Sequence, residues 1–179
     1  MIRDLEEGDL TRLTKIYNWY IRNTEITFET EELSTEAFSQ RAKGIQKRYP
    51  YLVLEEEGKV MGYAYLDTFN TRAAYDWTAD LSIYLDQSVR GKGYGSMLME
   101  AILRMAKRDG YYNVVSLITQ GNTGSEKIHE KFGFVRKALF ENYGYKNGKW
   151  LGVTYYSKAL VSQPSAAPEK PMNHPYNAD

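Results

Sequence analysis

The chain has 179 residues, a length that suits one domain, with or without a tail, and that can bury a substantial core. Lys and Arg together number 23 and so do Asp and Glu, so the charge balance favours a small partner over nucleic acid or a membrane. The lack of cysteine excludes disulfides, thiolate metal sites and thiol nucleophiles. The charged N-terminus is unlike a signal peptide and no apolar run is long enough to span a membrane, so we expect a soluble cytoplasmic protein.

Helices and a hairpin are predicted in the first part of the chain. The leading helix carries apolar residues three and four apart, from Leu10 to Tyr20, and the next helix opens on Ser34, a good helix cap, and closes before Pro50. In chain order we expect a strand at 2–5, a helix at about 9–22, a loop or short extended piece at 23–30, a helix at about 34–47, and strands at 51–56 and 60–68.

Residues 76–85 alternate strictly between apolar and polar side chains, which predicts a strand with one core face and one face polar enough to line a site. This strand leads into a glycine-rich turn and then into a long helix that ends at Asp109-Gly110. A buried strand at 113–118 follows the helix. Strand, helix and strand therefore form a βαβ unit in which the two strands are parallel.

The remaining sequence predicts a short helix, a hairpin and a tail. The helix contains His129 and stops at Gly133, and strands at 134–143 and 149–160 are joined through Asn147-Gly148, a strong hairpin signal. Residues 161–179 hold four of the five prolines and few large aliphatic side chains. We therefore expect one domain over residues 1–160 and a flexible tail. The alternative is a tail that docks on a neighbouring subunit, and its candidate contacts are Met172, Pro175 and Tyr176.

The turn over residues 90–96 is predicted to hold a phosphate group. Its three glycines allow positive φ angles and close approach of a ligand, and a helix that starts near Gly93 presents unpaired amides at its positive end. Arg90 and Lys92 add charge. The Walker A pattern is absent, and the third glycine comes one residue early for the G-x-G-x-x-G fingerprint of dinucleotide sites. A tight turn without a ligand is the alternative.

Two motifs in this order resemble the GNAT superfamily of acetyl-CoA-dependent N-acetyltransferases. Arg90, Gly93 and Gly95 match its R-x-x-G-x-G pyrophosphate loop, and residues 122–134 resemble its later motif, N-x-x-S followed by a His and then by Gly-Phe. Over roughly residues 1–160 the chain is most similar to the phosphinothricin and methionine sulfoximine N-acetyltransferase branch. Further matching stretches are Ile16-Tyr17-Asn18, Thr27-Phe28-Glu29-Thr30, Gly62-Tyr63-Ala64, Ser82-Ile83-Tyr84 and Gly148-Lys149-Trp150-Leu151.

The resemblance implies an α/β fold of the GNAT type, with a mixed, mostly antiparallel sheet of about seven strands, about four helices and one central parallel βαβ unit. It also implies acetyl-CoA as the acetyl donor, with its pantetheine arm beside a strand that splays from its neighbour. The implied donor-binding residues are Ile83, Tyr84, Leu85, Arg90, Gly91, Lys92, Gly93, Tyr94, Gly95, Ser96, Asn122 and Ser125. Asn122 and Ser125 are also good helix N-caps, which is an alternative role for both.

Asp80 and His129 are the implied catalytic residues. The amine must lose a proton before it attacks the thioester, and the resembled branch proposes a Glu as the base at the position of Asp80. Because Asp is one methylene shorter, either a water bridges the gap or Asp80 only orients the substrate. His129 stands where many members have a Tyr that protonates the leaving thiolate, so it is a candidate acid or a second candidate base. Alternatively, Asp80 and His129 are ordinary surface residues of a strand and a helix.

The acceptor pocket is implied by resemblance alone. The implied residues are Phe28, Arg72, Tyr75 and Lys149, whose cationic and phenolic groups would face an amino-acid-like acceptor with an anionic group. Core packing is an alternative for Phe28 and Tyr75. No clustered metal ligands occur, so no metal is expected. A homodimer is expected from the resemblance. The rival functions are acetylation of another amine, such as a polyamine, an antibiotic or a protein N-terminus, and an acyl-CoA-binding sensor without turnover.

Overall fold

The computed structural model describes residues 1–89, 91–162, 164 and 168–177. Its described elements are β1 (Ile2–Asp4), α1 (Leu10–Asn23), α2 (Thr35–Gln46), β2 (Tyr51–Glu56), β3 (Lys59–Thr68), β4 (Thr78–Leu85), α3 (Tyr94–Arg108), β5 (Asn113–Thr119), α4 (Thr123–Lys131), β6 (Val135–Lys146) and β7 (Lys149–Ala159). Short 3-10 turns lie at Glu7–Asp9 and Ala73–Tyr75. The predicted elements are all present, with bounds that differ by a few residues.

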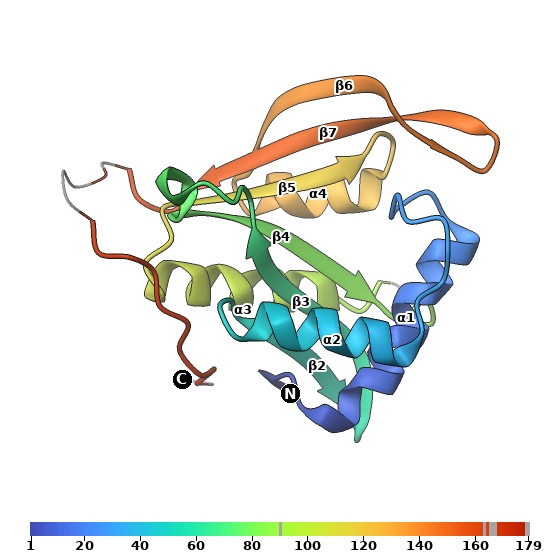
Figure 1. Ribbon diagram of the computed structural model, residues 1–179, viewed down its shortest axis with the longest axis horizontal. Coiled ribbons are helices and arrows are strands. Elements are labelled where there is room, and N and C mark those ends of the chain that lie inside the picture. Colours follow the sequence, from blue (N-terminus) through green and yellow to red (C-terminus); the bar gives the residue numbers. More distant parts are fainter. Residues whose placement is uncertain (90, 163, 165–167, 178–179) are drawn as a thin grey trace.

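The strands form one seven-stranded sheet in the order β1-β2-β3-β4-β5-β7-β6. Only β4 and β5 pair in parallel, and the other neighbours are antiparallel. The long helix α3 connects β4 to β5 and completes the βαβ unit (Figure 1). The predicted GNAT-type fold class is confirmed.

Local sequence accounts for the ends of several elements. Ser34 caps α2 by accepting a hydrogen bond from the Ala37 amide, as its position predicts. Asn147 and Gly148 both have positive φ, the conformation that a two-residue hairpin turn needs. Because this turn needs only two residues, β6 continues to Lys146 instead of ending near 143, with a register shift between Phe140 and Gly144.

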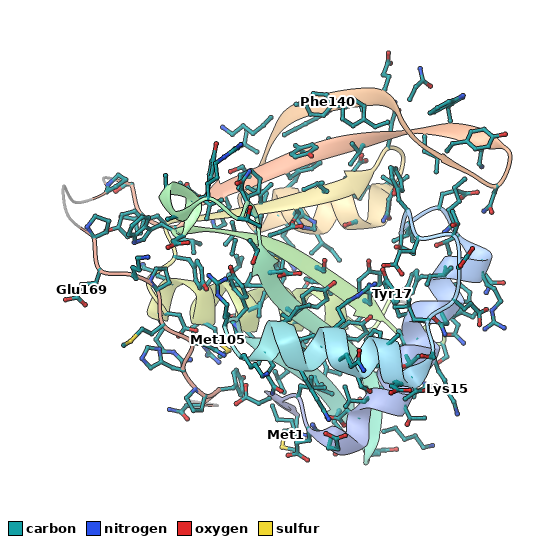
Figure 2. All side chains as sticks on the ribbon, in the orientation of Figure 1. Met1, Lys15, Tyr17, Met105, Phe140 and Glu169 are labelled. Carbon is teal, nitrogen blue, oxygen red and sulfur yellow. The ribbon has the colours of Figure 1, made fainter. Side chains whose placement is uncertain are left out.

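Helices cover the two faces of the β1–β4 half of the sheet. On one face, α1 and α2 pack their aromatic side chains on those of the strands: Tyr17 meets Tyr84, and Phe38 meets Tyr63. Figure 2 shows Tyr17 between α1 and the sheet. On the other face α3 approaches closely enough that a Cβ on Gly95 would lie 3.6 Å from Leu85 Cδ1. The buried core lies between these layers.

The central parallel strands separate soon after they meet. Their pairing covers only Thr78 to Asp80 on β4 and Asn113 to Val115 on β5. Beyond that point β4 stays paired with β3 up to Leu85, and β5 stays paired with β7 up to Thr119. The two strands diverge visibly in Figure 1. The edge of β4 after Asp80 therefore faces an opening instead of a neighbouring strand.

The described part of the C-terminal segment contacts the chain's own core. The Met172 amide donates to the Asp109 carbonyl, and the Asn173 side chain donates to the carbonyls of Gln46 and Tyr49. His174 Nδ1 lies 3.0 Å from the buried Asp109 carboxylate, and the Tyr176 amide donates to Asp4. Residues 168–177 thus make specific contacts that the prediction of a flexible tail did not include. The division of the chain at residue 160 stays a prediction.

Candidate active site

A cleft of about 520 Å³ opens where β4 and β5 diverge. Its walls come from the last residues of β4, the last residues of β5, the first turns of α4 and the glycine-rich turn. The lining residues are Tyr20, Ile26, Leu81, Ser82, Ile83, Tyr84, Leu85, Gly91, Gly95, Ser116, Leu117, Ile118, Thr119, Asn122, Gly124, Ser125, Ile128 and His129. The structure therefore places seven of the twelve predicted donor-binding residues around one opening: Ile83, Tyr84, Leu85, Gly91, Gly95, Asn122 and Ser125.

The backbone of β4 presents polar groups to this cleft. Ser116 Oγ of β5 donates to the Leu81 carbonyl at 3.4 Å, and Tyr20 Oη donates to the Leu85 carbonyl at 2.8 Å. Backbone groups two residues apart on a strand point to the same edge, so the Ile83 N–H and C=O face the opening as well. The backbone of Tyr84 points the other way, toward β3, while its side chain packs under α1. Ile83 can therefore pair with an extended amide-bearing ligand.

The glycine-rich turn has the backbone geometry of an anion cradle. Gly91 and Gly93 have φ of 78° and 81°, and Gly93 is the N-cap of α3. The bond from the Met97 amide to the Gly93 carbonyl is the first of the helix, so the amides of Tyr94, Gly95 and Ser96 precede the intrahelical bonds. Apart from the adjacent residues in the chain, no described atom lies within 4 Å of a Cβ placed on Gly91 or Gly93. The turn therefore has room for a ligand beside its amides.

The turn carries two basic residues, Arg90 and Lys92. Arg90 lies outside the described residues. Lys92 Nζ lies 3.4 Å from Glu56, and its pKa is raised mainly by the charge of Glu56.

Gly95 allows α3 to pack closely against α4, because a Cβ on Gly95 would lie 3.0 Å from Ile128 Cδ1 of α4.

Asp86 anchors the start of the turn, and the sequence reasoning did not identify it. Its buried carboxylate accepts hydrogen bonds from the Ser88 amide at 2.9 Å and from the side chains of Ser88 and Arg12. Burial acts to raise the pKa of Asp86, but these donors outweigh it and hold the pKa below its usual range. The signal in the sequence is Asp86-Gln87-Ser88, a pattern typical of an Asx turn after a strand.

His129 lines the cleft from α4 with one ring nitrogen fixed. Nδ1 lies 2.8 Å from the Ser125 carbonyl oxygen, and the ring packs edge-on against Phe134. A carbonyl oxygen only accepts, so Nδ1 carries the proton and Nε2 of the neutral ring has a lone pair. Nε2 is buried and has no hydrogen-bond partner among the described residues. Burial lowers the pKa of His129, so the neutral ring with a proton-accepting Nε2 dominates at neutral pH.

Asn122 and Ser125 hold the N-terminus of α4. Asn122 Oδ1 accepts a hydrogen bond from the Ser125 amide at 3.3 Å, so Asn122 has the capping role that was one of its two predicted alternatives. Ser125 contributes its carbonyl to His129, and both Asn122 and Ser125 line the cleft. Their part in donor binding stays a prediction.

Asp80 lies at the last β4–β5 pair, where the opening begins. Its Oδ1 is buried without a hydrogen-bond partner among the described residues. The pKa of Asp80 is raised to about 7, mainly by burial and secondly by the charge of the nearby Asp67. Asp80 is not itself in the cleft lining, but Ser82, two residues along the same face, is. A carboxyl group in this state can take up a proton at neutral pH.

The four predicted acceptor-binding residues lie in two separate regions. Arg72 and Tyr75 are exposed in the β3–β4 loop, where Tyr75 packs on Phe69. Phe28 lies against Gly144 of β6, and Lys149 Nζ pairs with Glu25 at 3.0 Å. The β3–β4 loop adjoins the start of β4. The Glu25 carbonyl instead accepts a hydrogen bond from Thr119, which is the last residue of β5. Figure 1 shows the β3–β4 loop and the end of β5 at opposite ends of these strands. The structure does not bring the four together, and their role stays a prediction.

A layer of tyrosine and aspartate side chains lies under α1 and α2, and the sequence predicted only the part that β4 contributes. Register places Tyr51 beside Tyr65, Tyr63 beside Tyr84, and Asp67 beside Asp80 on one face. The Arg41–Glu29 ion pair, at 2.6 Å, lies over the Tyr17 end of this layer. Alternation along 76–85 revealed the β4 half of the layer, but its β3 partners depend on strand register, which the sequence does not state.

Within the described ranges, no group of three or more His, Asp and Glu side chains is arranged to hold a metal ion. No described helix combines the length and apolar character required to cross a bilayer.

The chain is similar to known acetyltransferases along most of its length. The family model described as "Acetyltransferase (GNAT) domain" matches residues 2–154. The chain belongs to the GNAT acetyltransferase family. It is 30% identical over 171 residues to a phosphinothricin N-acetyltransferase of Streptomyces viridochromogenes, covering 96% of this chain and 93% of that one. It is also 30% identical over 172 residues to an L-methionine sulfoximine/L-methionine sulfone acetyltransferase of Salmonella typhimurium, covering 94% and 98%.

A solved structure agrees with these sequence matches. The crystal structure of a GNAT superfamily phosphinothricin acetyltransferase from Sinorhizobium meliloti in complex with AcCoA has a TM-score of 0.91 and 30% identity, covering 99% of this chain and 98% of that one. These findings make this GNAT chain an acyltransferase and support acetyl-CoA as its donor. The predicted resemblance is confirmed.

Proposed function

We propose that this GNAT protein transfers the acetyl group of acetyl-CoA to the amine of a small amino-acid-like acceptor by direct attack. The observation that carries the proposal is the opening between β4 and β5, with a strand edge along one side and the buried Nε2 of His129 in its lining. Two proton-accepting groups near one opening suit a reaction in which an amine must lose protons.

Donor binding would use backbone groups on both sides of the cleft. The amides of Tyr94, Gly95 and Ser96, with the open space beside Gly91 and Gly93, suit a pyrophosphate. The Ile83 edge suits the amides of a pantetheine arm. When bound, acetyl-CoA supplies an activated thioester. The residues of the turn and of β4 orient it toward Asp80 and His129.

Asp80 would take the first proton. The acceptor arrives as an ammonium, and the Asp80 carboxylate removes one proton so that the nitrogen gains a lone pair. A pKa of about 7 suits this step, because a base works best when its pKa is close to the working pH. Asp80 then releases that proton to solvent. The shorter reach of Asp relative to Glu is compatible with one water between carboxylate and amine.

His129 would move the second proton. Once the nitrogen bonds to the acetyl carbon it carries a proton that must leave, and the lone pair on His129 Nε2 can accept it. As the C–S bond breaks, the protonated ring donates this proton to the coenzyme A sulfur. His129 therefore acts first as a base and then as an acid, with Nδ1 held by the Ser125 carbonyl throughout. One proton goes to solvent and one to the thiol, so the reaction balances.

The acceptor class is supported by the relatives, whose names specify phosphinothricin and methionine sulfoximine or sulfone. We expect the α-amine of such an amino acid to be the nucleophile. A panel of acceptors tests this: amino acids, methionine sulfoximine and phosphinothricin on one side, and polyamines, aminoglycoside amines and peptide N-termini on the other. Release of free coenzyme A thiol with the first group supports the proposal. Release only with the second group would contradict the acceptor class.

We further propose a homodimer in the cytoplasm. The outer β5–β7–β6 part of the sheet carries exposed apolar side chains, and Phe140, visible on β6 in Figure 2, stacks on Tyr143. Tyr143 of β6 and Trp150 of β7 are 63% and 62% exposed, which suits a surface that a second copy covers. Light scattering coupled to size exclusion tests the dimer, since a monomer at micromolar concentration would contradict it.

A further inference from the structure

Asp67 and Asp80 face each other across the β3–β4 pair. They are direct partners in the register, so their side chains leave the sheet on the same face. The neighbouring rows on this face show the same relationship: the rings of Tyr51 and Tyr65 are 4.9 Å apart, and those of Tyr63 and Tyr84 are 5.5 Å apart. Two carboxyl groups thus occupy one cross-strand position at the point where β4 leaves β5.

The other titratable groups near Asp80 are phenols. Tyr65 faces it from β3 and Tyr155 from β7, and Tyr17 of α1 acts on Tyr65 in turn. Burial raises the pKa of all three phenols above the ordinary value, so they are uncharged at neutral pH. Among the described groups that act on Asp80, Asp67 is therefore the one acidic side chain.

The orientation of Asp67 is fixed locally. Its Oδ1 accepts a hydrogen bond from the Thr68 amide at 2.6 Å, and Thr68 Oγ1 is itself bonded to Tyr49 Oη at 3.0 Å. Asparagine retains an Oδ1 that can accept the same hydrogen bond, so the charge can be removed without removing this contact.

We propose that Asp67 is a positioning residue that acts through Asp80: its carboxylate, opposite Asp80, makes Asp80 a stronger proton acceptor and favours an acceptor that arrives as an ammonium. This inference rests on the proposed function for the role of Asp80, and goes beyond it in naming a second carboxylate. A like charge opposes ionisation of Asp80, and an incoming ammonium relieves the repulsion between the two carboxylates. The pair thus couples uptake of the amine to the strength of the base.

The test compares the full-length protein with three variants. Asp67→Asn removes the charge, Asp67→Glu retains it, and Glu57→Gln removes a charge from the turn at the far end of the β2–β3 hairpin. The Asp80 carboxyl is titrated by carbon-13 NMR without acceptor, its signal being assigned by its loss in Asp80→Asn. We expect Asp67→Asn to lower the Asp80 midpoint by on the order of one pH unit, while the other two stay near the wild-type value.

The kinetic readout is the pH profile of kcat/KM for thiol release. In Asp67→Asn the acidic limb should move to lower pH by the same amount and KM for the amine should rise, while acetyl-CoA affinity stays unchanged. An Asp80 midpoint that does not move in Asp67→Asn would overturn the inference, whether or not the enzyme turns over. A wild-type protein that releases no thiol from any amine would contradict the proposed function instead, and the NMR midpoint would still decide the role of Asp67.

Discussion

The Ser125 carbonyl oxygen lies 2.8 Å from His129 Nδ1, one turn further along α4. This contact selects the tautomer of the neutral ring and leaves a lone pair on Nε2, which is buried in the cleft wall. In the proposed mechanism, a histidine held in this way begins as a proton acceptor. It can donate a proton to the leaving sulfur only after it has taken one from the amine.

Replacing His129 by Ala should therefore slow turnover without weakening donor binding. Loss of a positioned general base typically costs a factor of about 10² to 10⁴ in rate, and we expect kcat to fall within that range. The dissociation constant of acetyl-CoA, measured by calorimetry, should change by less than about threefold, a difference of under 1 kcal/mol. Lys131→Ala, an exposed position on the same helix, is the control. Equal kcat in His129→Ala and wild type would remove His129 from the mechanism.

The pH dependence of the reaction follows from the state of Asp80. In the proposed mechanism the Asp80 carboxylate is the active form, and its pKa is raised to about 7, so kcat/KM should fall as the pH drops below that value. Asp80→Asn should lower the rate and remove this acidic limb. Stopped assays from pH 5 to 9, corrected for ionisation of the free amine, provide the measurement. A wild-type profile that stays flat between pH 5 and 7 would contradict a base at this position.

The raised pKa of Asp80 also predicts that the stability of the fold changes with pH in the direction opposite to the activity. The folded-state pKa of Asp80 lies above its unfolded value, so its contribution favours the folded state at low pH and is lost as the pH rises through about 7. At pH 8 the neutral Asp80→Asn should unfold with a free energy about 1–3 kcal/mol higher than wild type. The difference should shrink as the pH falls to 5. Denaturant unfolding at both pH values tests this, and a less stable variant at pH 8 would refute it.

The cradle can be tested with a matched pair of glycines. Gly93 and Gly58 both have positive φ, at 81° and 73°, and among the described residues only their chain neighbours come within 4 Å of either Cβ position. Gly93→Val and Gly58→Val should therefore lose similar stability, on the order of 1–2 kcal/mol. Only Gly93→Val should lose acetyl-CoA affinity, by at least about tenfold, or 1.4 kcal/mol. Comparable affinities in the two variants would show that the turn does not hold the donor.

The C-terminal segment gives a prediction about stability rather than catalysis. Removing residues 161–179 deletes the contacts of Asn173 and His174 with α2 and Asp109, and leaves the buried Asp109 without His174. We expect the truncated chain to lose about 1–3 kcal/mol of unfolding free energy, since each net hydrogen bond contributes about 1 kcal/mol. Its kcat and KM should be unchanged. A truncated chain as stable as the full one would support a flexible tail that contributes nothing.

The helices, the strands and the glycine-rich turn were predictable because they depend on local patterns. Alternation gave β4, the Asn147-Gly148 pair gave the last hairpin, and the spacing of glycines gave the turn before α3. The relation of Asp67 to Asp80 depends on how β3 registers with β4, and the tautomer of His129 depends on a carbonyl one helical turn away. Neither is visible in a linear pattern. Arg72 and Lys149 were both cationic candidates for the acceptor pocket, but Arg72 lies in the β3–β4 loop and Lys149 is the first residue of β7, so the two are in separate regions.

We propose that the opening between β4 and β5 supports acetyl transfer to an amino-acid amine. The most direct measurement is thiol release from acetyl-CoA in the presence of methionine sulfoximine, with mass spectrometry of the acceptor. We predict one thiol released for each N-acetylated acceptor, at a rate that falls in His129→Ala and Asp80→Asn. Tight binding of acetyl-CoA with no thiol release from any amine in the panel would contradict the claim and favour an acyl-CoA sensor.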